Sequence, residues 1–145
     1  MDAAKIVSKI SKEHGIIKNV YFLACGGSLV DLYPGYYFVR AESAVMDAQW
    51  IPAREFALTP PKKLGKDSLL IICSHSGKTK ECLEAAKTGM DAGAAVVTMT
   101  HAPGSPCDTD KWISVVYDWA PGVKEAEKPQ GIVLRILNEL MKVQE

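Results

Sequence analysis

The stretch Leu69-Leu70-Ile71-Ile72-Cys73-Ser74-His75-Ser76-Gly77-Lys78-Thr79 joins an uninterrupted apolar run to a polar turn. An apolar run of this length, bounded by a turn, indicates a strand that is covered on both faces. Residues 80–93 then return to helical spacing, with Leu83, Ala86 and Met90 expected to face inward. A buried strand, a polar turn and a helix together form the repeating unit of a parallel sheet.

The same alternation extends over the rest of the chain. Apolar runs predict strands over 20–24, 94–100 and 115–117, and Trp50-Ile51-Pro52 followed by Arg54-Glu55-Phe56 suggests a weaker strand. Helical spacing predicts helices over 3–14, 29–42 and 131–143, and the Pro- and Gly-containing residues 59–65 predict a loop. We therefore expect an α/β fold: a three-layer, flavodoxin-like sandwich with roughly five parallel strands and helices on both faces. The length of 145 residues suits one domain, residues 1–145.

Composition excludes several kinds of partner. Lys+Arg and Asp+Glu both number 17, so no basic excess predicts binding to nucleic acid or to an anionic membrane. No apolar run approaches the roughly 18 residues of a membrane span, and residues 1–15 lack a secretory apolar core, so we expect a cytoplasmic protein. The four cysteines are widely spaced without a CxxC pair, which favours reduced thiols over a metal site or disulfides.

The turn after the central strand has the composition of an anion site. In an open parallel sheet, ligands bind beyond the carboxyl ends of the strands. The free N–H groups of the following helix and the positive end of its dipole favour a phosphate. Ser74, Ser76 and Thr79 add hydroxyl donors, and Gly77 permits backbone angles that gather N–H groups into one concavity. Helix capping alone would explain one such hydroxyl, but not three around a glycine.

A second loop, and the absence of two nucleotide-binding motifs, limit the kinds of ligand that the site can bind. Gly26-Gly27-Ser28 follows the strand expected at 20–24, and its glycines let the backbone approach a ligand closely. Gly77-Lys78-Thr79 has the ending of a triphosphate loop, but the earlier glycine of that motif would fall on Ile72 inside the strand. The segment from Gly26 to Asp31 lacks the later glycines of a dinucleotide fingerprint. We therefore expect a site for one phosphate, without a metal or a cofactor.

With these motifs in order, the chain resembles the sugar isomerase (SIS) family of phosphosugar-binding domains. The phosphate loop of that family reads Ser-x-Ser-Gly-x-Thr followed by an acidic residue, and residues 74–81 fit it. Val20–Leu29 is similar to the family's first strand and glycine–serine loop, and residues 53–56 are similar to its Ala-Ser-Glu-Phe segment. Thr100–Pro106 resembles the loop after the fourth strand. The resemblance covers nearly the whole chain.

Within the family, the chain is most similar to the first half of two tandem enzymes. These are the fructosamine-6-phosphate deglycases, which release a hexose phosphate and an amino acid, and the isomerase part of glutamine–fructose-6-phosphate aminotransferase. The resemblance implies that a sugar phosphate binds through Ser74, Ser76 and Thr79, helped by backbone at Gly77 and Lys78. It also implies that Gly26, Gly27 and Ser28 line the sugar.

The chain departs from the aminotransferase pattern at two places: the first, at His75, favours the deglycases, and the second, at residues 126–130, means that no catalytic role carries over. His75 stands where the aminotransferases have glutamine, and it either contacts substrate or is a loop histidine placed by its neighbours. Ala126-Glu127-Lys128-Pro129-Gln130 interrupts a segment that carries an acidic residue followed by Ala-Ser-Thr-Lys in the aminotransferases. Glu125 and Glu127 are candidates for acid–base catalysis, or else solvated glutamates in a charged loop.

The resembled enzymes take their catalytic groups from a second domain and are dimers or larger. The chain is then either a fragment of such an enzyme or a stand-alone binding domain, and in both cases we expect it to be inactive alone. The alternatives are a regulatory domain that senses a sugar phosphate and a purely structural role. The apolar face at Ile132, Leu134, Ile136, Leu137 and Leu140 is either core or an association surface for a homodimer.

Overall fold

The computed structural model describes all 145 residues and contains one five-stranded parallel sheet. Its strands follow the order β2-β1-β3-β4-β5. Their bounds are Asn19–Ala24 for β1, Asp47–Pro52 for β2, Ser68–Cys73 for β3, Ala95–Thr100 for β4 and Ile113–Val116 for β5. The most apolar run of the sequence is thus the central strand, and all six residues of β3 are buried.

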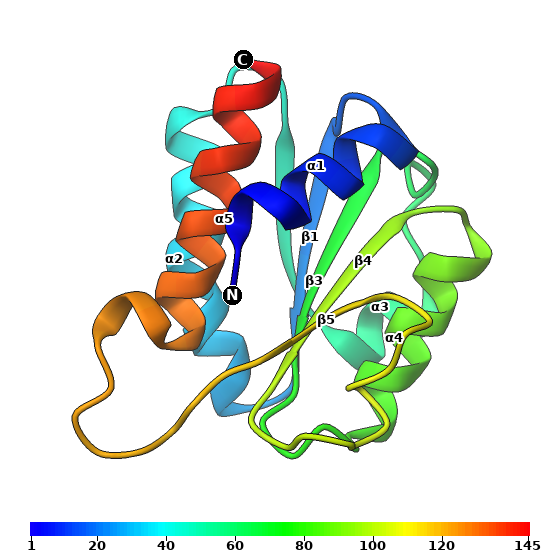
Figure 1. Cartoon of the computed structure of the whole chain (residues 1–145). Coiled ribbons are helices and arrows are strands. Elements are labelled where there is room, and N and C mark those ends of the chain that lie inside the picture. Colours follow the sequence, from blue (N-terminus) through cyan, green and yellow to red (C-terminus); the bar gives the residue numbers. More distant parts are fainter.

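Helices cover both faces of this sheet (Figure 1). One face carries α1 (Ala3–His14), α2 (Gly27–Glu42) and α5 (Pro129–Gln144), and the other carries α3 (Ala53–Leu58) and α4 (Lys80–Asp91). A single 3₁₀ turn, η1 (Glu125–Glu127), precedes α5. The predicted three-layer α/β sandwich is confirmed. None of the helices combines the length and apolar character that crossing a membrane requires.

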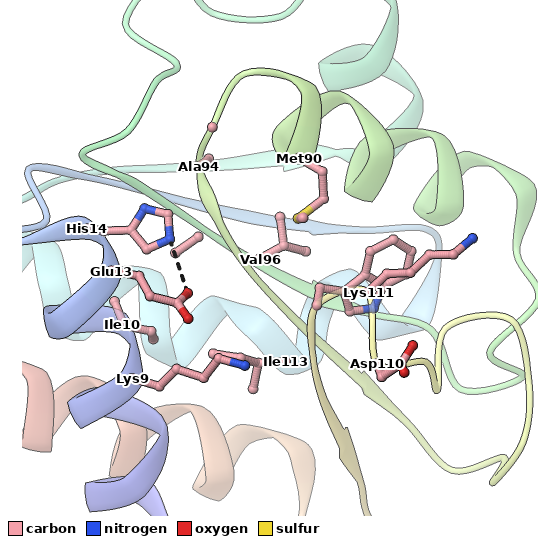
Figure 2. A pocket seen from close by; sticks show the side chains of 13 residues that line it. Lys9, Ile10, Glu13, His14, Met90, Ala94, Val96, Asp110, Lys111 and Ile113 are labelled. Atoms are coloured by element: carbon pink, nitrogen blue, oxygen red, sulfur yellow. Dashed lines mark ion pairs between the residues drawn. The ribbon is translucent and has the colours of Figure 1, made fainter.

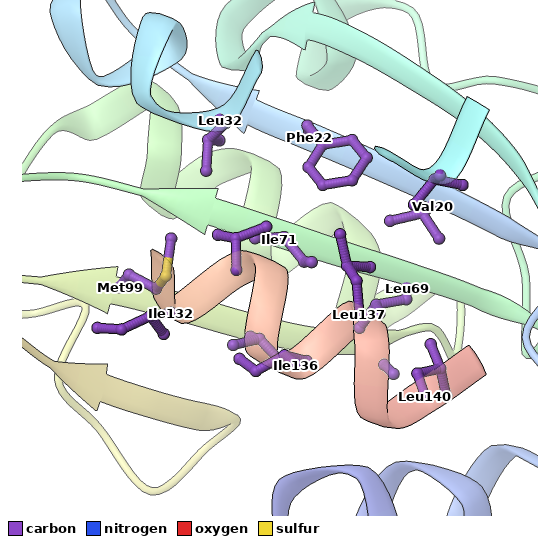
Figure 3. Close-up of a cluster of buried hydrophobic side chains, with 14 of the residues drawn as sticks. Val20, Phe22, Leu32, Leu69, Ile71, Met99, Ile132, Ile136, Leu137 and Leu140 are labelled. Atoms are coloured by element: carbon purple, nitrogen blue, oxygen red, sulfur yellow. The ribbon is translucent and has the colours of Figure 1, made fainter. Parts of the chain in front are cut away.

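Alternate residues of each central strand feed two separate cores, because successive side chains of a strand point to opposite faces. The larger core joins Phe22 and Ile71 to the apolar faces of α1, α2 and α5, and the smaller core joins Leu70 and Ile72 to α3 and α4. Figure 3 shows the larger core, where the labelled residues of α5 lie beneath those of β1, β3 and β4. The sheet is therefore shielded from water on both sides.

Two local expectations were wrong. Residues 53–58 form α3 instead of continuing a strand, and β2 lies earlier, at Asp47–Pro52. Pro52 has no N–H for the ladder, and Ala53 and Phe56 are buried on one side of the new helix. In α4, Ala86 is buried as expected, but Met90 is 41% exposed, and Cys82, Ala85 and Gly89 complete the inner face. The inner face of α4 needs small residues because Leu70 of β3 packs directly against Gly89. A Cβ added at Gly89 would lie 2.4 Å from the side chain of Leu70.

Most of the apolar face of α5 is used inside the chain. Ile132, Ile136, Leu137 and Leu140 are each at most 1% exposed in the larger core, and Leu134 is half-buried beside α2. The close approach of the two helices depends on Gly35 of α2, because a Cβ there would lie 2.5 Å from Val133. This face is therefore explained by core packing, and it gives no argument for association.

Replacing Leu137 with alanine tests the packing of α5. Leu137 is fully buried, so we expect Leu137→Ala to lower the free energy of unfolding by about 2–5 kcal/mol. Val143 lies on the same helix and is 56% exposed, so Val143→Ala should change it by less than about 0.5 kcal/mol. Urea unfolding of the two variants measures both values. Equal losses would show that α5 does not close the core.

Candidate phosphate-binding site

The parallel register brings the two candidate loops to one edge of the sheet. Ala24 pairs with Cys73, and Cys73 pairs with Met99, so β1, β3 and β4 end side by side. The glycine–serine loop, the 74–79 turn and the loop after β4 therefore leave the sheet as neighbours, at the lower end of the sheet in Figure 1. This is the edge at which open α/β sheets bind ligands.

The hydroxyl of Ser74 shapes the turn from within. Ser74 is only 2% exposed, and its Oγ accepts the N–H of Gly77 at 3.1 Å and lies 2.9 Å from Oγ1 of Thr79. Its own N–H donates to the carbonyl of Met99 on β4 at 2.9 Å. A buried hydroxyl with these partners is already occupied, so Ser74 positions the turn, whereas Ser76 and Lys78 remain exposed around it.

Gly77 is required where the turn meets the loop after β4. Its φ is +71°, and a Cβ would lie 1.9 Å from Oγ of Ser105 and 2.7 Å from Oγ1 of Thr100. Its carbonyl accepts the N–H of Cys107 at 2.8 Å. Only glycine combines the left-handed backbone with this contact, so the turn is held against a neighbouring loop instead of moving freely.

The turn opens onto the unsatisfied N–H groups of α4. Thr79 is the N-cap residue, and its side chain makes no capping bond. The first i to i−4 bond runs from the N–H of Leu83 to the carbonyl of Thr79, so the N–H groups of residues 80–82 precede the intrahelical ladder. With the exposed hydroxyl of Ser76 and the partly exposed Thr79, they form a set of neutral donors at the positive end of a helix dipole.

An aromatic cluster adjoins the turn, and sequence reasoning did not find it. His75 Nδ1 lies 2.9 Å from the hydroxyl of Tyr117, and its ring stacks on that of His101 with centroids 5.0 Å apart. The edge of Trp119 packs on His75 at 5.0 Å. His101 Nδ1 lies 3.1 Å from the carbonyl of Tyr117, which can only accept, so this nitrogen carries a proton. Tyr117 and Trp119 follow the last strand, and only the parallel sheet places them near His75.

Burial controls the charge state of the groups beneath the cluster. Burial raises the pKa of the Cys73 thiol to about 12, and it raises the pKa of the Tyr117 hydroxyl well above its ordinary value. Both groups therefore stay protonated at neutral pH. Burial also raises the pKa of Asp31 in the first turns of α2, and the neighbouring His75 opposes that shift. Asp31 is thus the titratable carboxyl group beside the turn.

The glycine–serine loop lies at the start of α2. Gly26 has a φ of +57° as the N-cap residue, and the helix itself begins at Gly27. Ser28 lies in the first turn of the helix and is half-buried. The structure therefore brings the two candidate loops together across the β1–β3 pair.

The two candidate glutamates have structural partners. Glu125 Oε1 lies 2.8 Å from Nζ of Lys128, an ion pair that holds the pKa of this carboxyl below its usual range. Glu127 Oε1 lies 3.4 Å from Nη1 of Arg135. Both side chains are exposed at the entry to α5, where these ion pairs account for them.

A separate cavity lies at the opposite, amino-terminal edge of β4 and β5 (Figure 2). It measures about 310 Å³ and lies between α1 and the segments that lead into these two strands. Figure 2 shows Glu13 and His14 of α1 on one side of the cavity and Lys111 on the other. Oε2 of Glu13 lies 4.0 Å from Nε2 of His14. None of the predicted site residues lines it.

Comparison with known proteins tests the resemblance to the sugar isomerase family. The chain is 35% identical to fructosamine deglycase FrlB of Bacillus subtilis over 129 residues, which is 89% of this chain and 39% of that protein. It is 31% identical to the isomerizing glutamine–fructose-6-phosphate aminotransferase of Clostridium tetani over 113 residues, 77% of this chain and 18% of that protein. The resemblance to the sugar isomerase family is confirmed. No family model matches the chain.

Solved structures agree with this likeness. The crystal structure of a candidate phosphosugar isomerase from Salmonella typhimurium matches 99% of the chain with a TM-score of 0.91 and 32% identity. The chain covers 43% of that protein, so it spans less than half the length of that protein and of the two relatives above. A more distant neighbour, the NanR protein of Vibrio vulnificus, is complexed with ManNAc-6P. At 20% identity and a TM-score of 0.59, that likeness concerns the fold alone.

Two glycine variants separate packing from backbone strain at the turn. Gly77 and Gly104 have φ values of +71° and +74°, but a Cβ at Gly104 meets open space. Gly104→Ala should cost about 1–2 kcal/mol of unfolding free energy, the penalty of a left-handed non-glycine residue. Gly77→Ala should cost more, because Ser105 must also move. Thermal unfolding compares the two, and equal losses would mean that the contact with Ser105 does not constrain the turn.

Proposed function

We propose that this chain is the phosphosugar-binding domain of a deglycase that acts on fructosamine 6-phosphates and releases a hexose 6-phosphate and an amino acid or amine. The observation that carries the proposal is the Ser74–Thr79 turn, fastened by Ser74 and Gly77 at the amino end of α4. The likeness to a fructosamine deglycase over 89% of the chain supports the choice of substrate class.

In this proposal the phosphate lies at the start of α4. The hydroxyls of Ser76 and Thr79 and the N–H groups near Lys78 donate to its oxygens, while Ser74 and Gly77 hold the turn in shape. These donors are fixed before the ligand arrives, which lowers the entropic cost of binding. The sugar extends toward Gly26, Gly27 and Ser28, with His75 at its side.

The alternative with specific support is an isomerase or aminotransferase domain that acts on fructose 6-phosphate or glucosamine 6-phosphate. The likeness to the Clostridium tetani aminotransferase favours it, but at lower identity and over less of the chain than the deglycase. A domain that senses sugar phosphates without converting them would use the same turn. All three functions share the phosphate site and differ in the rest of the substrate.

The bond-breaking groups are expected outside the 145 residues. The matched deglycase is more than twice as long as the part that this chain covers. Glu125 and Glu127, the candidates within the chain, are engaged by Lys128 and Arg135. We infer that the chain binds substrate and that the remaining residues of such an enzyme, together with assembly into a homodimer or a larger oligomer in the cytoplasm, supply turnover.

Incubation with substrate tests whether the 145-residue chain binds the substrate without converting it. The 145-residue protein should bind fructoselysine 6-phosphate without releasing glucose 6-phosphate, because the matched deglycase is more than twice as long and the two candidate glutamates are held in ion pairs. A coupled assay for glucose 6-phosphate measures the release. Steady turnover by the chain alone would overturn this part of the proposal.

A thermal-shift experiment tests the phosphate site itself. Fructose 6-phosphate at 100 times its dissociation constant should stabilise the wild-type chain by about 2.7 kcal/mol. Ser76→Ala removes a hydroxyl that donates to a charged group, so its affinity should fall about tenfold or more. Ser8→Ala, at an exposed position of α1, should bind like the wild type. If neither sugar phosphates nor inorganic phosphate stabilise the wild type, the turn is not a phosphate site.

A further inference from the structure

A cavity of about 290 Å³ opens beside the aromatic cluster. It lies between the first turns of α2 and the segment from β5 to the start of α5, which Figure 1 shows looping out beside α2. Trp119 belongs to both features, because its ring lines the cavity and its edge packs on His75 of the phosphate turn. The cavity and the turn are therefore in contact through Trp119.

Two carboxylates without an ion-pair partner line the cavity. Asp31 and Asp118 both line it, and none of the five ion pairs of the chain includes either residue. Asp118 accepts only the N–H of Ala120, at 3.0 Å, and so keeps acceptor capacity on its other oxygen. The face of Trp119, which is 52% exposed, offers a cation–π surface beside them. These groups suit a protonated amine.

The lining also includes donors. Lys128 and Gln130 line the cavity from the start of α5, and both turn one donor toward Glu125, at 2.8 Å and 3.4 Å. An ammonium group has three donors and an amide group has two, so each side chain keeps at least one for a ligand. Positive and negative groups thus line one cavity of about 290 Å³, which is large enough for a small organic group.

We propose that this cavity, here called the amine pocket, holds the amino-acid part of the substrate. Asp31 and Asp118 take its ammonium group, and Lys128 and Gln130 take its carboxylate. The inference rests on the proposed function, because the sugar phosphate at the 74–79 turn aims the amine along His75 and Trp119. The amine pocket would in addition favour amines that carry both an ammonium group and a carboxylate over amines that lack these groups.

Calorimetric titration of the 145-residue chain with two ligands whose side chains are equally long tests the amine pocket. Both ligands share the secondary amine that joins the sugar to a five-carbon chain, but only fructoselysine 6-phosphate carries an α-ammonium group and an α-carboxylate; the fructosamine 6-phosphate made from pentylamine lacks both. The wild type should bind the first about tenfold more tightly, as expected for hydrogen bonds to charged groups. Asp31→Asn should remove most of this difference without weakening fructose 6-phosphate, and Lys128→Met should reduce it as well.

Asp91→Asn is the matched control, because Asp91 is an exposed residue that ends α4. It should preserve the tenfold difference. Equal binding of the two fructosamines by the wild type, or an equal loss for all ligands in Asp31→Asn, would refute the amine pocket and leave the phosphate site standing. Failure of the wild type to bind even fructose 6-phosphate would instead refute the proposed function and the pocket with it.

Discussion

The register of the parallel sheet is the constraint from which the site follows. Ala24, Cys73 and Met99 are paired across β1, β3 and β4, and Thr100 is paired with Val116 of β5. Four chain segments that lie far apart in the sequence therefore leave the sheet at one edge. The glycine–serine loop, the phosphate turn, the 100–107 loop and the Tyr117–Trp119 segment meet there because no other placement keeps the ladder intact. A slip of one residue would reverse which side chains enter each core.

The proposed phosphate site would bind an anion in a chain without net charge. It would use backbone N–H groups and hydroxyls instead of a basic patch, and such donors need accurate placement because each contributes little alone. The chain supplies that accuracy by fastening the turn from both sides. Ser74 bonds across it, and the carbonyl of Gly77 is held by Cys107 in the neighbouring loop. The contacts that hold the turn in shape would therefore also place the donors of the proposed site.

The sequence allowed the architecture and the strand–turn–helix unit around residues 69–93 to be predicted, because both are local patterns. The apolar run at 69–73, its hydroxyl-rich turn and the next helix are contiguous, so periodicity and capping rules were enough. The aromatic cluster could not be found in this way, since His75, His101 and Tyr117 become neighbours only through the sheet order. The inner face of α4 was misjudged because side-chain size decided it: Gly89 lies under Leu70, and the larger Met90 turns outward. The sequence also could not distinguish the buried Ser74, which holds the turn in shape, from the exposed Ser76, because only the structure shows that their burial differs.

The central claim is that a sugar phosphate binds at the amino end of α4, and amide chemical shifts in a titration of the 145-residue protein with fructose 6-phosphate test it most directly. The claim predicts the largest shift changes at residues 76–82, which comprise the end of the turn and the free N–H groups at the start of α4. Residues of the cavity at the opposite edge, near His14 and Lys111, should barely change. Largest changes at that opposite edge, with residues 76–82 unaffected, would contradict it.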